Sequence, residues 1–320
     1  MNRIGVLTSG GDSPGMNAAI RGVVRSASAR GAEVIGFMRG YQGIIERDAI
    51  PMDSKSVGGI ISRGGTVLRT ARSMEFREHD GRRKAVANLN DLGIEGLVVI
   101  GGDGSLTGAR ALHDEFHFPV MGVPGSIHND IAGTDFSIGF DTAVNTAVEA
   151  IDRVRDTAYS HDRVFVIEVM GRSNGFIALE AGIAAGAEAI LMPEVPFSLN
   201  EVVEDLMKGA ERGKKSSIIL CAEGAISATE VFAFLTLRTP FEVRPLVLGH
   251  MQRGGSPTAF DRVLALRLSA FATNRLLSGF RGEMAGVDGG KLVSNSLEYV
   301  LTTGRKVDPE RLSLVETMAR

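Results

Sequence analysis

Short apolar runs that end in glycine alternate with amphipathic helical stretches along almost the whole chain. This alternation is the feature that most constrains the fold, because runs of about four to eight apolar residues suit strands buried on both faces of a parallel sheet. We expect strands at residues 3–10, 32–40, 94–102, 119–123, 163–171, 188–193, 216–224 and 244–249. The helical pattern is clearest at 141–158, where Val144, Ala147, Ile151 and Val154 recur at helical spacing. The alternation predicts an α/β fold with mainly parallel sheets.

Length and composition limit the class of protein. The 320 residues, 44% of them hydrophobic, suffice for roughly two domains. No linker rich in Pro or Ser divides them. A formal net charge of −3 argues against a dedicated nucleic-acid binder. The single cysteine, Cys221, cannot form an internal disulfide, which predicts a reducing cytoplasm. We expect no signal peptide, because the N-terminus turns polar and glycine-rich within ten residues. We expect no membrane contact, because no apolar stretch approaches the roughly 18 residues that a span needs.

Glycine-rich polar segments follow most of the expected strands. In open α/β sheets, ligands bind at the carboxyl ends of the strands, so chemistry is expected there. The segments read TSGGDSPG after the first strand, GGDGS after the third, PGSIHND after the fourth, and MGRSNG, AEG and GHMQRGGSP after later strands. A turn needs the Gly and Asn of PGSIHND, but it does not need Ser126, His128 and Asp130 as well.

Two segments are typical of anion binding at a helix N-terminus. In SGGDSPG (9–15), two glycines precede a helix that we expect to open at Pro14. This fits either ordinary helix capping or a backbone nest for a phosphate. In GGDGS (101–105), glycines flank Asp103, so a ligand can approach the backbone while one carboxylate faces it. A carboxylate beside a phosphate indicates Mg²⁺, and the alternative is a capped turn.

Arginine accounts for 28 of the 35 basic residues. Its planar, always charged fork suits phosphate oxygens, although a compositional bias explains the excess equally well. RGGTVLRTARSMEFR (63–77) is either a solvated basic face or a shaped loop that presents an arginine. In GHMQRGGSP (249–257), His250 and Arg253 precede two glycines and indicate an anion pocket.

A hydrolase is the competing interpretation of one segment. GRSNG (171–175) fits the G-x-S-x-G pattern of a nucleophile elbow, with Ser173 as the nucleophile. That chemistry needs an acid and then a histidine downstream, where His250 is the only histidine. It would also leave the glycine cradles and the arginines unexplained.

Taken together, these segments closely resemble the bacterial ATP-dependent 6-phosphofructokinases over nearly the whole chain, to about residue 280. The resemblance rests on TSGGDSPGMNAAIRGVVR, GGDGS, PGSIHND, GTDFSIGFDTAVNTAVEAIDRVRDTA, VMGR, AEG and LGHMQRGGSP. It implies the phosphofructokinase fold, with two Rossmann-like three-layer domains facing each other across a cleft, and usually a homotetramer. It implies an ATP-binding domain at 1–138 plus about 252–305, and a sugar-phosphate-binding domain at 139–251 plus about 306–320. The implied reaction, a step of glycolysis, transfers the γ-phosphoryl group of MgATP to the 1-hydroxyl of fructose 6-phosphate.

The resemblance also implies roles for individual residues. Contacts to ATP fall on Gly11, Arg72, Ser73, Gly102, Asp103, Gly104 and Ser105, with Mg²⁺ held by Asp103. Contacts to the sugar phosphate fall on Ser126, Ile127, His128, Asp130, Arg163, Met170, Gly171, Arg172, Glu223, Arg244, His250, Met251, Gln252 and Arg253. Arg163 and Arg244 would reach in from a neighbouring subunit. The catalytic set is His128, Ser126, Arg72 and Arg172. Gly104 and Gly125 stand where pyrophosphate users carry Asp and Lys, which favours ATP as donor.

An effector site for ADP or phosphoenolpyruvate is implied as well. It falls on Arg21, Arg25, Arg155, Gly186, Glu188, Arg212, Lys214 and Lys215. Ser54 and Lys55 depart from the family here, because relatives often have an arginine and an aromatic that stacks on adenine. This departure puts activation by a nucleotide in doubt.

The important departure is His128. The family's loop reads T-I-D-N-D, and its first Asp is the general base; here the loop reads Ser126-Ile127-His128-Asn129-Asp130. A neutral imidazole is the stronger base, with a reference pKa of about 6.5 against 3.9. It is also longer, and near-attack geometry tolerates less than about 1 Å of error. We therefore expect a kinase with slow turnover. The alternatives are a catalytically silent binding subunit, with His128 natural or introduced, and the serine hydrolase.

Overall fold

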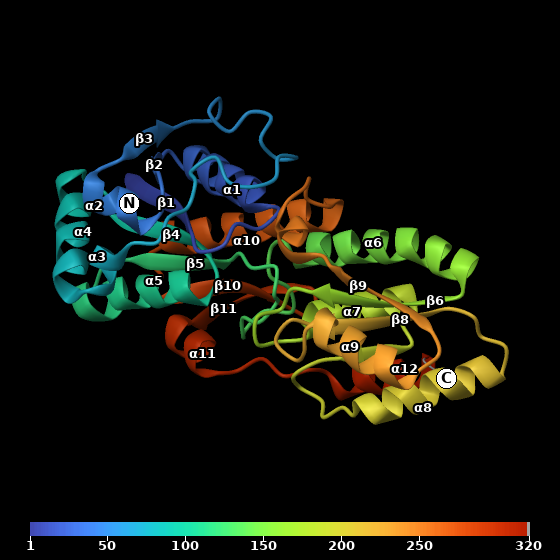
Figure 1. Cartoon of the computed structure of the whole chain (residues 1–320). Coiled ribbons are helices and arrows are strands. Elements are labelled where there is room, and N and C mark those ends of the chain that lie inside the picture. Colours follow the sequence, from blue (N-terminus) through green and yellow to red (C-terminus); the bar gives the residue numbers. More distant parts are fainter. Residues whose placement is uncertain (319–320) are drawn as a thin grey trace. The chain divides into compact units, whose positions relative to one another are not determined.

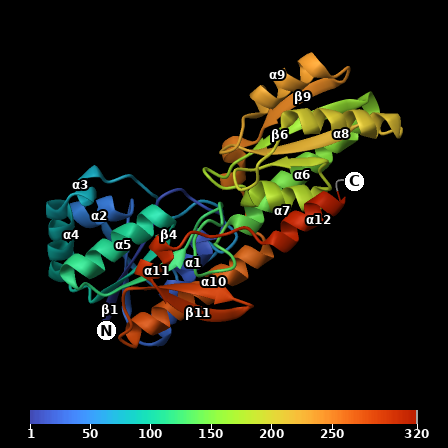
Figure 2. The ribbon, with the colours of Figure 1, turned by 90° about the horizontal axis from the view of Figure 1, so that it is seen from below.

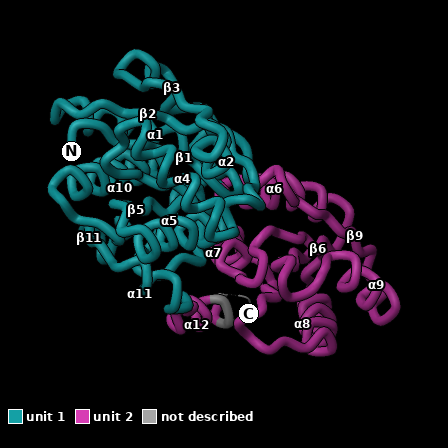
Figure 3. Tube along the Cα trace, turned by 90° about the vertical axis from the view of Figure 1, so that its left-hand side faces the viewer, with its two compact units in different colours: residues 1–142, 253–305 teal, residues 143–252, 306–320 magenta. Residues whose placement is uncertain are grey.

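A computed structural model describes residues 1–318 and divides the chain into two compact units (Figure 3). Unit 1 comprises residues 1–142 and 253–305, and unit 2 comprises residues 143–252 and the segment from Lys306 onward. Residues 319–320, which the expected second domain includes, lie outside the described part of the chain. Among the described residues, no helix combines the length and apolar character needed to cross a membrane.

Unit 1 is built on a seven-stranded sheet with the order β11-β10-β5-β4-β1-β2-β3 (Figure 1). Its strands are β1 (Arg3–Ser9), β2 (Glu33–Phe37), β3 (Ala49–Met52), β4 (Gly96–Gly101), β5 (Val120–Pro124), β10 (Glu283–Asp288) and β11 (Lys291–Ser296). The five inner strands pair in parallel, and the two edge strands β3 and β11 are antiparallel to their neighbours. Its helices are α1 (Met16–Ala29), α2 (Tyr41–Glu46), α3 (Met74–Arg77), α4 (His79–Asp91), α5 (Asp103–Phe116), α10 (Ala259–Leu277) and α11 (Leu297–Thr302).

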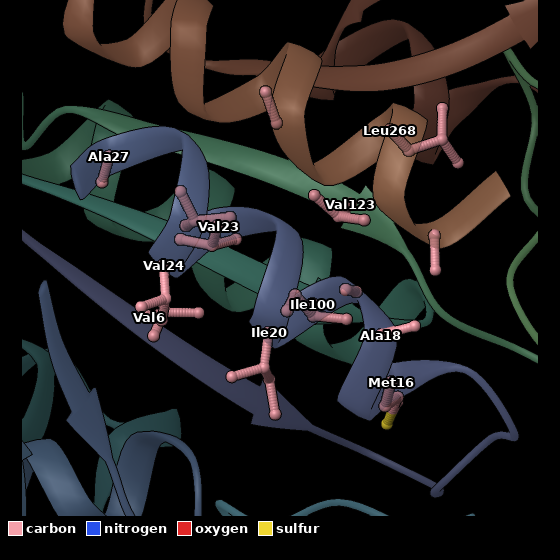
Figure 4. Packing of buried hydrophobic residues seen from close by; sticks show 14 of the residues in the cluster. Val6, Met16, Ala18, Ile20, Val23, Val24, Ala27, Ile100, Val123 and Leu268 are labelled. Carbon is pink, nitrogen blue, oxygen red and sulfur yellow. The ribbon is translucent and has the colours of Figure 1, made fainter. Parts of the chain in front are cut away.

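The sheet of unit 1 is covered on both faces, which explains why its inner strands are mainly apolar. Val6 and Ile100 join Ile20 of α1 and Leu268 of α10 in one buried cluster (Figure 4). Alternate residues such as Leu7 belong to a second cluster, formed with α2, α4 and α5. Each such side chain stabilises the fold by about 1.5–3 kcal/mol when fully buried. Figure 2 shows the hairpin of β10 and β11 next to α10.

Unit 2 contains a four-stranded, fully parallel sheet with the order β7-β8-β6-β9. Its strands are β6 (Arg163–Val169), β7 (Ala189–Leu191), β8 (Ser217–Ala222) and β9 (Glu242–Val247). Its helices are α7 (Phe176–Ala185), α8 (Leu199–Glu211), α9 (Ala228–Arg238) and α12 (Pro309–Met318), together with α6 (Phe140–His161), which begins in unit 1. A 3-10 helix, η1 (Gly249–Arg253), follows β9.

The predicted α/β class with mainly parallel sheets is confirmed, and all eight predicted strands are present. Three further strands, β3, β10 and β11, were not predicted. The prediction that a helix opens at Pro14 is wrong. The helix α1 begins at Met16, its N-cap is Gly15 with φ of 106°, and no side chain caps it. Gly15 tolerates this backbone conformation because it has no Cβ.

Candidate active site

The loops after β1 and β4 lie side by side because the two strands are neighbours, with Ser9 opposite Gly101. Gly102 is the N-cap of α5, and the first N–H groups of a helix have no partner within it. The Ser105 hydroxyl is buried and has no hydrogen-bond partner among the described residues. Its Oγ lies 3.1 Å from the position of a Cβ added to Gly10. These two loops therefore place backbone donors and small side chains together, as a phosphate cradle requires.

Asp103 and Gly104 offer a position for a metal ion. Asp103 is the exposed first residue of α5, and a Cβ added to Gly104 would have no heavy atom within 4 Å. Within residues 1–318, no group of three or more His, Cys, Asp or Glu side chains is placed to hold a metal. A single carboxylate beside open backbone suits Mg²⁺, which takes its other ligands from phosphates and water.

Gly125 is enclosed, unlike Gly104. A Cβ added to Gly125 would lie 3.2 Å from Met16 Cε and 3.4 Å from the backbone N of Gly101. A lysine at this position would therefore have to displace the packing between β4 and α1. Close packing is therefore a structural reason for a glycine at position 125, in addition to its predicted role in selecting ATP.

Arg253 lies against Gly11, an arrangement that the sequence analysis missed. A Cβ added to Gly11 would lie 2.0 Å from Arg253 Nη1, so the guanidinium occupies the space that any side chain at Gly11 would need. The Nε of Arg253 is buried without a hydrogen-bond partner among the described residues. We assigned Gly11 to the ATP phosphates and Arg253 to the sugar phosphate, and unit 1 brings the two together.

Four other predicted site residues differ in exposure. Arg72 and Arg172 are exposed, and Arg172 adopts a positive φ of 55°. Ser73 is the N-cap of α3, and its Oγ accepts a hydrogen bond from the Phe76 N–H at 3.2 Å. The Ile127 side chain is 2% exposed. Ser73 thus caps a helix and Ile127 is buried, so each has a structural role besides its predicted contact with a ligand.

The loop at residues 125–130, the His128 loop, is fixed by its own polar groups. His128 is 3% exposed, and its N–H donates to Ser126 Oγ at 3.2 Å. Ser126 Oγ donates in turn to Asp130 Oδ1 at 3.2 Å. Asn129 adopts a positive φ of 53°, and its Oδ1 accepts the Ser137 N–H at 2.8 Å. The loop therefore places an imidazole, a hydroxyl and a carboxylate within one ordered turn.

In unit 2, side chains hold the backbone of the segment after β6, residues 170–172. Glu223 Oε1 accepts hydrogen bonds from the N–H groups of Gly171, at 3.1 Å, and Arg172, at 2.7 Å. Gln252 Oε1 accepts the Met170 N–H at 2.8 Å, while its Nε2 is buried without a partner among the described residues. We predicted all five as substrate contacts. The structure shows that Glu223 and Gln252 also hold the other three in place.

The predicted phosphate-binding arginines of unit 2 share one carboxylate. Arg163 on β6 lies opposite Glu242 on the edge strand β9, and their salt bridge measures 3.0 Å. Arg244 pairs with the same carboxylate. The hydrogen bond from Arg163 lowers the pKa of Glu242. His250 and Met251, which were also predicted to contact the sugar phosphate, are exposed on η1.

The predicted effector residues of unit 2 partly come together. Arg155 donates to the carbonyl oxygen of Gly186 at 3.0 Å, and Lys214 Nζ lies 2.8 Å from Glu188 Oε1. Arg155 is 4.0 Å from the same carboxylate oxygen. Two other predicted residues of unit 2, Arg212 and Lys215, are exposed, as is Arg25 in unit 1.

The remaining effector positions lie in unit 1. Arg21 Nη1 donates to the Val57 carbonyl oxygen at 2.7 Å, which orders the segment after β3. Lys55 N–H donates to Asp53 Oδ1 at 2.9 Å, and backbone hydrogen bonds from Ser56 and Lys55 lower the pKa of Asp53. Ser54 and Lys55 therefore lie in a turn held by Asp53.

Replacing Ser173 tests the hydrolase alternative. Ser173 is exposed in the turn before α7, and the positive φ belongs to Arg172, not to the serine. We expect Ser173→Ala to change kcat and KM for phosphoryl transfer less than about twofold, because the kinase reaction that the resemblance implies gives this hydroxyl no role. Steady-state rates measure this, and a collapse of activity would revive Ser173 as a nucleophile.

Comparisons with known proteins place the chain in a family. A model of the phosphofructokinase family matches residues 3–276. The ATP-dependent 6-phosphofructokinases of Halalkalibacterium halodurans and Bacillus subtilis are each 54% identical over 319 residues, which cover 100% of both chains. A phosphofructokinase structure from Pichia pastoris superposes with a TM-score of 0.90 at 36% identity, covering 99% of this chain and 39% of that one. The match to the family model and the relatives at 54% identity show that the chain belongs to the phosphofructokinase family.

Proposed function

We propose that this chain is an ATP-dependent 6-phosphofructokinase that transfers the γ-phosphoryl group of ATP to the 1-hydroxyl of fructose 6-phosphate. The observation that carries the proposal is the pair of glycine-rich loops after β1 and β4, which present Asp103 beside open backbone next to Gly104. Full-length relatives at 54% identity with this activity in their names support it.

The loops of unit 1 would hold the nucleotide. Gly11 and Gly102 allow the phosphates to approach the backbone, and Arg72 adds positive charge from an exposed segment. Asp103 would hold Mg²⁺, which neutralises charge on the phosphates when bound. Arg253, which packs on Gly11, would place the guanidinium assigned to the sugar phosphate beside the same loops. Positioning and charge stabilisation of this kind supply most of the catalysis in phosphoryl transfer.

The segment after β6 and η1 would bind the sugar phosphate. Met170, Gly171 and Arg172 are ordered by Glu223 and Gln252, so their backbone groups are held in place before a ligand binds. The 6-phosphate would contact His250 and Arg253, together with Arg163 and Arg244 from a neighbouring subunit.

His128 would accept the proton from the sugar 1-hydroxyl, where the family resemblance places an Asp. A neutral imidazole has a lone pair for this proton, and a protonated one has none. Because the ring is buried in an ordered loop, it has little freedom to adjust to the hydroxyl. We therefore expect phosphoryl transfer to proceed, but slowly, because proton transfer by a placed base contributes roughly 10²–10⁴-fold.

We further propose a cytoplasmic homotetramer with an effector site, as the family resemblance implies. The grouping of Arg155, Glu188 and Lys214 in unit 2 supports an anion site at these residues. The anionic effector would be ADP or phosphoenolpyruvate. The turn at Asp53–Lys55 offers no aromatic ring to stack on adenine, so we expect phosphoenolpyruvate to have the larger effect.

A comparison of two phosphoryl donors tests the proposed function. With fructose 6-phosphate as acceptor, we expect MgATP to yield ADP and fructose 1,6-bisphosphate, and pyrophosphate to yield no product. The reason is that Gly104 leaves open space for the nucleotide, and that Gly104 and Gly125 supply neither the carboxylate nor the ammonium of pyrophosphate users. A coupled assay for ADP and a product assay measure this. Product from pyrophosphate would contradict the choice of donor, and binding without any turnover would favour the silent subunit.

A further inference from the structure

Asp261 is a fully buried carboxylate that the proposed reaction does not use. It lies in the first turn of α10 and accepts three hydrogen bonds from the start of α6. Its Oδ1 accepts the Gly139 N–H at 2.9 Å, and its Oδ2 accepts the Thr142 N–H at 2.8 Å and the Thr142 hydroxyl at 2.5 Å. The N-terminus of one helix is thus fastened by a side chain from the N-terminus of another.

Residues at the start of α10 and at the start of α6 each donate hydrogen bonds to the other. Thr258 caps α10, because its Oγ1 accepts the Asp261 N–H at 3.2 Å. The Thr258 hydroxyl donates to Asp141 Oδ2 at 2.6 Å, and the Thr258 N–H donates to Thr142 Oγ1 at 3.1 Å. This reciprocal network gives the first residues of α6 one fixed position relative to α10.

The segment that Asp261 holds is the one that supports the His128 loop. Directly before Gly139, Ile138 N–H donates to the Pro124 carbonyl at 2.9 Å, and Ser126 N–H donates to the Ile138 carbonyl at 3.1 Å. Ser137 Oγ donates to the Ser126 carbonyl at 2.6 Å. A shift of Gly139 would therefore move its neighbours Ile138 and Ser137, and these two residues bond the backbone of Ser126.

The hydrogen bonds to Asp261 favour its ionised form, while its burial and a nearby acid oppose it. Burial raises the pKa of Asp261 to about 6, the hydrogen bonds from Thr142 and Gly139 oppose that rise, and the nearby Asp141 adds to it. The three hydrogen bonds that Asp261 accepts use both of its oxygens, as an ionised carboxylate does. Two helix N-termini meet there, and their dipoles stabilise a negative charge.

We propose that Asp261 is a positioning residue for phosphoryl transfer, which holds Gly139 and Thr142 and through residues 137–139 sets the position of Ser126 and His128. This inference rests on the proposed function. The segment and the carboxylate are 122 residues apart in sequence, from Gly139 to Asp261, so the fold alone brings them together.

Asp261→Asn tests the proposal. The amide keeps the size of the side chain but turns an NH₂ group toward N–H donors, so part of the network is lost. We expect kcat to fall about tenfold or more while KM for ATP and for fructose 6-phosphate changes less than threefold. We also expect the imidazole NMR signal of His128, assigned by its loss in His128→Asp, to shift.

Asn88→Ala is the matched control. Asn88 is also buried in unit 1, and its side chain donates to the carbonyls of Ile44 and Ile45 at 3.0 Å and accepts from Arg47 Nε at 2.7 Å, none of them in the His128 loop. We expect this variant to lower Tm without moving kcat or the His128 signal. Equal behaviour of the two variants, with Tm lowered and both kcat and the His128 signal unchanged, would overturn the proposal.

A second pair of variants serves if Asp261→Asn does not fold. Thr142→Val removes the hydroxyl that Asp261 accepts, and Thr142→Ser keeps it. We expect the valine variant to lower kcat and shift the His128 signal, and the serine variant to restore both. No difference between the pair would contradict the positioning role. If the parent protein transfers no phosphoryl group at all, the proposed function fails, while the NMR signal of His128 still tests this inference by itself.

Discussion

Asp103→Asn is expected to lower kcat with MgATP by roughly 10²–10³-fold, the range found when a group that stabilises transition-state charge is removed. The asparagine keeps the size of the side chain at the start of α5 and removes the negative charge that attracts the metal ion. The dependence of the rate on Mg²⁺ concentration should move to higher concentrations. Fructose 6-phosphate should still bind, as measured by calorimetry, because no residue assigned to the sugar is altered.

The control for this variant is Asp80→Asn. Asp80 is likewise an exposed acid in the first turn of a helix, α4, and it pairs with Arg83 at 3.0 Å. Gly81 follows Asp80, but it is buried, and a Cβ added to it would lie 1.9 Å from the Glu75 carbonyl oxygen, so a phosphate has no room to approach its backbone. The loss of Asp80 should therefore leave the rate and the Mg²⁺ dependence unchanged. If Asp103→Asn keeps the Mg²⁺ dependence of the parent protein, Asp103 does not hold the metal ion.

Strands buried on both faces were predictable because burial leaves a continuous apolar run, such as GLVVIG in β4. The three missed strands lie at or near the edges of the sheet. β3 contains Pro51, and β11 is only half-buried, so neither shows such a run. The turn Gly289–Gly290 between β10 and β11 is a hairpin signal that the sequence analysis did not use.

The positions of the candidate site residues were predictable where a loop follows a strand, since parallel strands end at a common edge. Contacts between residues far apart in sequence were not. Nothing near Gly11 indicates that Arg253 lies against it. Asp261 looks like an ordinary residue in the first turn of a helix, and only the folded chain shows that it bonds Gly139. Glu223 was assigned to the sugar, and its bonds to backbone N–H groups were equally invisible.

His128 decides how fast the proposed reaction runs. An Asp base stays ionised across pH 6–9, so it gives no pH dependence there. A histidine base works only when neutral, and negative phosphates nearby favour its protonated form. Any kcat that depends on His128 should therefore rise with pH through about 7 to 8 and then level off.

The most direct test is kcat as a function of pH for the protein and for His128→Asp, measured with saturating MgATP and fructose 6-phosphate. We predict a low kcat that rises through about pH 7 to 8 in the protein as it stands. In His128→Asp, we predict a kcat roughly 10²-fold or more higher, without that rise, because the carboxylate is restored where the family places its base. A fast parent protein with a flat profile between pH 6 and 9 would show that another group accepts the proton, and would contradict the role assigned to the His128 loop.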